Sequence, residues 1–116
     1  MAKQEWIDFT DAHREGFVVV ALVLPKGRPV MSRGRVESMR ATLERLIERL
    51  VPSAVYASKI VPQDETVEIY FVFEKEADAQ RVADAVRARP TRQYPGWAGQ
   101  WSFELDEQQR RRSKPH

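Results

Sequence analysis

One apolar run dominates the sequence: Gly16-Phe17-Val18-Val19-Val20-Ala21-Leu22-Val23-Leu24. Its apolar side chains occupy both sets of alternating positions, and many of them are β-branched. A strand with this composition is usually buried on both faces, because one with a solvated face alternates with polar residues. The run therefore predicts the central strand of a sheet, with cover needed on both sides.

The run stops at Pro25, and Lys26-Gly27-Arg28-Pro29 favours neither a helix nor a strand. A helix is predicted next, over residues 33–51, with Ser32 as N-cap and Pro52 as its stop. Its apolar residues recur at spacings of three and four, which places them on one helical stripe. They are Val36, Met39, Leu43, Leu46, Ile47 and Leu50.

Three strands and a second helix follow. Strands are predicted over residues 54–61 and 66–73, joined by a turn at 62–65. The second of these strands alternates, with Val67, Ile69, Phe71 and Phe73 on one face. A helix over residues 74–89 ends at Pro90, a Pro-Gly turn follows, and a last strand runs to Leu105.

The order strand, helix, strand, strand, helix, strand is the split β-α-β pattern of the ferredoxin-like sandwich. The predicted fold class is α+β, a four-stranded antiparallel sheet with both helices on one face. A chain of 116 residues suffices for one such domain. We expect it over residues 16–105, between an N-terminal segment (1–15) and a disordered basic tail (106–116).

Composition narrows the function classes. The sequence has no cysteine, and His13 and His116 make no pair at metal-ligand spacing, so we predict no metal, no cofactor and no catalytic residue. The longest apolar run is far shorter than the roughly 20 residues of a membrane helix, and the first residues resemble no signal segment. The sequence predicts a cytoplasmic protein that does not enter a membrane.

In the predicted antiparallel sheet, loop 25–32, hairpin 62–65 and loop 90–99 meet at one end. They would gather a basic and aromatic cluster: Lys26, Arg28, Arg33, Arg35, Arg89, Arg92, Tyr94 and Trp97. Guanidinium groups bind phosphates and carboxylates, and aromatic rings stack on bases, so this cluster is the candidate site for an anionic partner. The alternative is that these are solvated arginines beside two rings that cap the core.

The helix-free face of the sheet is the second candidate site. It would present Glu68, Tyr70, Val72, Ser102 and Glu104, together with four apolar side chains of the strand over residues 16–24. Contiguous exposed apolar patches mark interaction sites, and symmetric homodimers are the commonest assemblies, so we expect a second copy to cover this face. The N-terminal segment or an apolar ligand would serve the same purpose.

No stretch carries a motif specific to one chemistry. The first hypothesis is a non-enzymatic binding or regulatory module that self-associates through its sheet face and contacts an anionic partner, nucleic acid or acidic protein, through its arginine-rich loops. The second is a nucleic-acid-binding protein that uses the basic and aromatic cluster. The third is a small dimeric enzyme or ligand carrier with a pocket at the sheet face. Against the third, Glu68 and Glu104 would lie about 9–10 Å apart, across a strand, which is wide for paired carboxylates.

Overall fold

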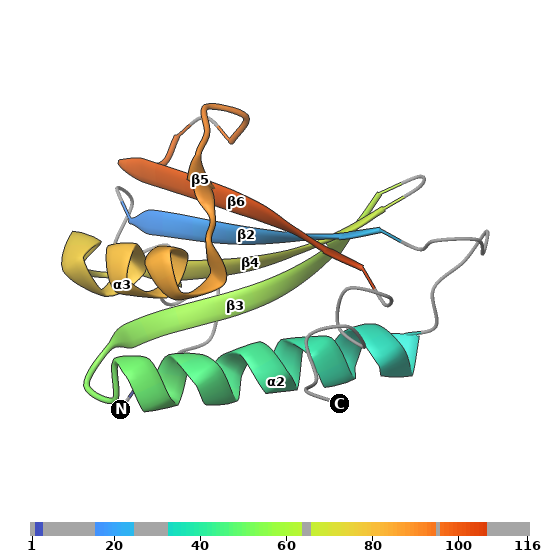
Figure 1. Cartoon of the computed structure of the whole chain (residues 1–116), viewed down its shortest axis with the longest axis horizontal. Helices are drawn as coiled ribbons and strands as arrows, with labels where there is room; N and C mark the ends of the chain where they lie inside the picture. Colours follow the sequence, from blue (N-terminus) through green and yellow to red (C-terminus); the bar gives the residue numbers. More distant parts are fainter. Residues whose placement is uncertain (1, 4–15, 25–32, 64–65, 95, 107–116) are drawn as a thin grey trace.

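The structure is a computed structural model that describes residues 2–3, 16–24, 33–63, 66–94 and 96–106. Within these residues, two helices and a mixed sheet make an α+β fold (Figure 1). The elements, in chain order, are β1 (Ala2–Lys3), β2 (Phe17–Leu24), α2 (Arg33–Leu50), β3 (Val55–Pro62), β4 (Val67–Phe73), α3 (Glu76–Val86), β5 (Arg89–Pro90) and β6 (Gly99–Asp106).

The apolar run forms the centre of the sheet, as predicted. Strand order is β3-β4-β2-β6-β5, and the two residues of β1 add a short parallel pairing beyond β3. Strand β2 pairs with β4 on one side and with β6 on the other. A strand flanked in this way exposes neither edge, which is consistent with its apolar composition.

The prediction of a four-stranded antiparallel, ferredoxin-like sheet is wrong, because β6 runs parallel to β2 and β5 adds a further strand. The cause lies after α3. The helix ends at Val86, not at Arg89, and Arg87 takes left-handed backbone angles (φ 58°, ψ 37°). The chain then runs back as β5 and reverses once more before β6. This additional reversal inverts the direction of the last strand.

Helix α2 begins where predicted and ends one residue earlier, at Leu50. It runs along β3 (Figure 1). The Nε of Arg81 in α3 donates a 3.0 Å hydrogen bond to the Leu50 carbonyl oxygen, one of the groups that a helix end leaves without an internal partner. Neither helix has the length and apolar character needed to cross a bilayer, as far as the chain is described.

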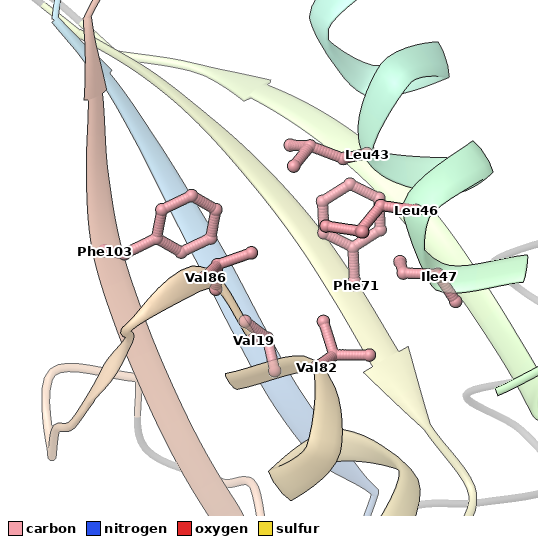
Figure 2. A pocket seen from close by; sticks show the side chains of 8 residues that line it. All are labelled: Val19, Leu43, Leu46, Ile47, Phe71, Val82, Val86 and Phe103. Atoms are coloured by element: carbon pink, nitrogen blue, oxygen red, sulfur yellow. The ribbon is translucent and has the colours of Figure 1, made fainter. Parts of the chain in front are cut away.

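A small apolar gap lies between the two helices and the sheet. Figure 2 shows Leu43, Leu46 and Ile47 of α2 on one side of it and Val82 and Val86 of α3 on the other. Its free volume is about 10 Å³, and its lining offers no polar side chain. Apolar cavities of this kind stay dry, so the gap is a packing feature of the core.

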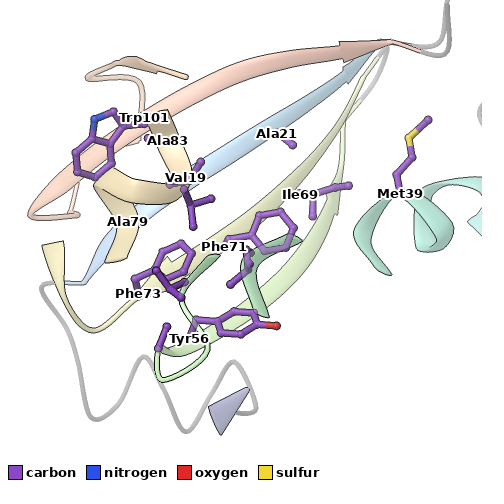
Figure 3. Close-up of a cluster of buried hydrophobic side chains, with 14 of the residues drawn as sticks. Val19, Ala21, Met39, Tyr56, Ile69, Phe71, Phe73, Ala79, Ala83 and Trp101 are labelled. Carbon is purple, nitrogen blue, oxygen red and sulfur yellow. The ribbon is translucent and has the colours of Figure 1, made fainter. Parts of the chain in front are cut away.

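The main core lies between the helices and one face of the sheet. Val19, Phe71 and Phe73 are buried there, and Trp101 lies in the same cluster as Ala79 and Ala83 of α3 (Figure 3). The alternation predicted for β4 is confirmed, since Ile69, Phe71 and Phe73 belong to this cluster and Val67 packs against it. The rings of Tyr56 and Phe73 stack with centroids 5.8 Å apart.

The opposite face of the sheet carries a second buried cluster. Val18, Val20, Ala57 and Val72 are fully buried. Tyr94 belongs to this cluster and Trp97 packs against it. The expectation that β2 leaves its second apolar face exposed is therefore wrong for Val18 and Val20. Sequence reasoning treated residues 90–99 as a turn at the end of the sheet, whereas this segment places two rings on its face.

Candidate functional site

The β5–β6 connection, described for residues 91–94 and 96–98, is attached to the sheet at both ends. The Thr91 amide donates to the Gln100 carbonyl oxygen at 3.1 Å, and the Ala98 amide donates to the Gly16 carbonyl oxygen at 3.0 Å. Gly96 has a φ of 101°, a left-handed value that favours glycine. A turn is thus present at Gly96, and Pro95 of the predicted Pro-Gly turn lies outside the described residues.

Tyr94 lies over the helix-free face. Its amide donates to Gln100 Oε1 at 2.9 Å, and its ring meets the Tyr70 ring edge to face, with centroids 5.4 Å apart. Its hydroxyl donates to Glu68 Oε2 at 2.9 Å. Glu68 Oε1 in turn accepts hydrogen bonds from Tyr70 Oη at 3.2 Å and from Gln63 Nε2 at 3.0 Å. We call Glu68, Tyr70 and Tyr94 the tyrosine–glutamate cluster.

Ionisation of the two phenols is disfavoured in this cluster. Burial, followed by the charge and the hydrogen bond of Glu68, raises the pKa of Tyr70 to about 12. Burial and then the hydrogen bond to Glu68 raise the pKa of Tyr94 above its ordinary value of 10. Both tyrosines therefore remain protonated donors at neutral pH. Glu68 accepts hydrogen bonds from both phenols and from the Gln63 side-chain amide.

The structure brings only part of the predicted basic and aromatic cluster together, since Arg89 and Tyr94 line the same open hollow. Arg35 lies in the first turns of α2, which follows the end of β2, whereas Gly99, at the start of β6, pairs with Phe17 at the start of β2. Parallel pairing therefore starts β6 beside the start of β2, away from the end of β2 that leads to α2 and Arg35, whereas Tyr94 lies over the sheet face. Lys26, Arg28 and the side chain of Arg33 lie outside the described residues.

The predicted sheet-face residues do share one face. Leu22 is the register partner of both Glu68 and Glu104, so β2 separates the two carboxylates as expected. Tyr70 and Ser102 are both register partners of Val20. Val72 is fully buried, however, and has no surface to offer a partner.

An open hollow of about 880 Å³ lies at the sheet edge, beside β6 and β5. Val86 and Phe103 line it from the helix side, and Leu22, Tyr94 and Ser102 line it from the other side. The polar side chains around it are Arg87, Arg89, Gln93 and Glu104. We call Arg87 and Arg89 with this hollow the arginine edge.

Arg87 and Arg89 are exposed, and neither side chain forms a hydrogen bond or ion pair with another residue that the structure describes. Sequence reasoning included Arg89 but missed Arg87, Gln93 and Leu22. Arg87 and Arg89 stand at the end of the helix predicted over residues 74–89. The sequence offers one indication of this site: Arg87 and Arg89 lie between a predicted helix and Pro90, where the chain has to turn.

Within the described ranges, no group of three or more histidine, cysteine, aspartate or glutamate residues could hold a metal ion. Comparisons with protein families, curated proteins and solved structures find no match to this chain.

Proposed function

We propose that this chain is a small, non-enzymatic binding module that holds an anionic partner at the arginine edge. The observation that carries this proposal is the left-handed backbone conformation of Arg87. Left-handed angles cost a residue with a side chain about 1–2 kcal/mol relative to glycine, which commonly occupies the position after a helix. The described part of the chain offers the Arg87 side chain no ion pair that would offset this cost.

Strained positions cluster at functional sites, so the Arg87 guanidinium is the first candidate for contact with a partner. Arg89 lies two residues away on the same hollow, and Arg92 is exposed nearby in the sequence. Guanidinium groups bind carboxylates and phosphates with two parallel hydrogen bonds. Glu104, across the hollow, restricts the anion to the side of the two arginines.

The nucleic-acid hypothesis receives less support. Single-stranded nucleic acid binds where aromatic faces are free to stack on bases. Tyr94 is buried against Val18 and Val20, and Trp97 packs on the same cluster. Of the arginines that this hypothesis joins, Arg35 follows the end of β2, whereas Arg92 precedes β6, which begins beside the start of β2.

Self-association through the sheet face, and a ligand pocket there, stay predictions. Both predictions assume four exposed apolar side chains of the strand over residues 16–24, and Val18 and Val20 are fully buried. Leu22 remains partly exposed on that face. The molar mass of the purified chain in solution, compared with 13.5 kDa for one copy, decides whether it self-associates.

The arginine edge is tested by charge reversal. Hexaglutamate and a short oligothymidine are titrated into the labelled chain while backbone amide shifts are recorded. We expect shifts at Arg87, Arg89, Gln93 and Ser102 and, in the Arg87→Glu/Arg89→Glu variant, an affinity loss of about tenfold or more. The matched control, Arg45→Glu/Arg49→Glu, makes the same charge change at exposed positions of α2. Equal losses in both variants, or shifts centred on Arg35, would contradict the proposal.

A further inference from the structure

We propose that the anionic partner is the C-terminal end of an extended peptide, which pairs with the outer edge of β6 and places its terminal carboxylate at Arg87 and Arg89. This inference rests on the proposed function and specifies its partner. Three observations carry it: the unpaired backbone of β6, the shape of the hollow, and the direction of β5.

The outer edge of β6 is only partly occupied. Strand β5 pairs with Trp101 and Ser102, and the Thr91 amide donates to the Gln100 carbonyl oxygen. In an antiparallel pair, alternate residues direct both backbone groups to the same neighbour. Gln100 and Ser102 therefore face β5, and Glu104 and Asp106 face outward beyond its end. No other described strand lies there, and such an edge is a template for an added strand.

The hollow continues around this edge to both faces of the sheet. Phe103 and Val86 line it on the helix side, and Leu22 and Tyr94 line it on the other side. Successive side chains of a strand point to opposite faces. An added strand would thus place an apolar side chain beside Phe103 and Val86 and its next side chain on the face of Glu104.

The direction of the peptide follows from β5, which runs antiparallel to β6. A peptide in the same direction as β5 approaches Arg89 with its C-terminal end. Its carboxylate then meets the two guanidinium groups, whereas a peptide in the opposite direction would bring its N-terminal ammonium to them.

The charge of Glu104 favours a terminal carboxylate over an acidic side chain as the bound anion. An acidic side chain opposite Glu104 would be repelled, because like charges on directly opposed residues destabilise a strand pair. A second copy paired through this edge would bring acidic residues of two β6 strands together.

The test uses the full chain and a randomised hexapeptide library in two forms, with free C-terminal carboxylates and with C-terminal amides. We expect the immobilised protein to enrich peptides from the free-acid library. The best of these should lose at least about tenfold in affinity on amidation, as for one charge-assisted hydrogen bond. Hydrogen exchange at the Glu104 and Asp106 amides should slow when this peptide binds.

Two changes test the backbone pairing. N-methylation of the peptide residue opposite Glu104 removes one ladder hydrogen bond and should abolish binding. Glu104→Pro removes the outward amide and leaves the bonds between β6 and β2 in place, so it should abolish peptide binding and retain hexaglutamate binding. The N-methylated peptide keeps the test decisive if the proline variant does not fold.

The outcomes separate this inference from the proposed function. Equal affinity for acid and amide, no enrichment, or binding without protection of Glu104 would overturn strand addition. Hexaglutamate binding that is lost in Arg87→Glu/Arg89→Glu would still support the anion site. Failure of both probes to bind would overturn both proposals.

Discussion

The hydroxyl of Tyr94 donates a 2.9 Å hydrogen bond to Glu68 Oε2, 26 positions away in the sequence. This bond attaches the β5–β6 connection to the middle of the sheet. It holds the Tyr94 ring over Val18 and Val20 and keeps one wall of the arginine edge in place.

Removal of the Tyr94 hydroxyl should destabilise the chain. In Tyr94→Phe, a part-buried Glu68 oxygen loses its partner, which typically costs about 1–3 kcal/mol of the free energy of unfolding. Tyr70→Phe is the control, because it removes a longer bond, 3.2 Å, to the other oxygen. Urea denaturation measures both variants, and a Tyr94→Phe variant as stable as the parent would show that the bond contributes nothing.

Tyrosine ionisation should be delayed in the folded chain. All three tyrosines have a raised pKa, that of Tyr70 about 12, whereas the unfolded chain ionises near 10. Between these values the unfolded state binds fewer protons than the folded state, so stability is complete below pH 10 and falls as pH rises above it. Absorbance at 295 nm should show little tyrosinate at pH 10 in buffer and about half ionisation in denaturant. Equal curves would contradict the assigned burial.

Gly99 should tolerate no side chain. A Cβ at this position would lie 2.9 Å from Phe17 Cδ1 and 3.0 Å from the Trp101 ring. Gly99→Ala should therefore cost about 1–3 kcal/mol of unfolding free energy, as other overpacked sites do. Gly34→Ala in α2 is the control, since a Cβ there meets nothing within 4 Å and alanine favours helix. Thermal denaturation should show opposite shifts for the two variants.

Replacement of Arg87 by glycine should raise the stability of the chain and lower its affinity for anions. Arg87→Gly relieves the left-handed strain and should raise the free energy of unfolding by about 0.5–1 kcal/mol, while affinity for hexaglutamate falls. Arg87→Lys keeps the strain and one positive charge, so it should leave stability unchanged. A loss of stability in the glycine variant would mean that the Arg87 side chain supports the fold.

Much of the architecture could be predicted from local patterns. The helical period of α2 and the alternation of β4 depend on residues close in sequence, and both predictions are confirmed. The central place of β2 followed from apolar side chains at every position, because only a strand flanked on both sides and covered on both faces buries them all.

The direction of β6 could not be predicted, because it depends on the additional strand β5 and on the reversal between β5 and β6. Strand β5 consists of Arg89 and Pro90, which the sequence pattern places at the end of a helix, so no local pattern marks them as a strand. The same reversal affects the predicted basic cluster, because the segment before the last strand was assigned to the end of the sheet where β2 ends, whereas β6 begins where β2 begins. The placement of Tyr94 on the sheet depends on a partner, Glu68, that no local pattern identifies.

The pairing of β2 with β6 also affects how the chain reaches its fold. Strand β2 lies near the start of the sequence, and its neighbour β6 ends the described part. Loop-closure entropy must be offset before such distant segments meet, so sheets of high contact order fold slowly, in milliseconds to seconds. During synthesis, β2 is complete long before β6 leaves the ribosome. Until then the most apolar strand of the molecule has an open edge, at which a nascent chain is most prone to aggregate.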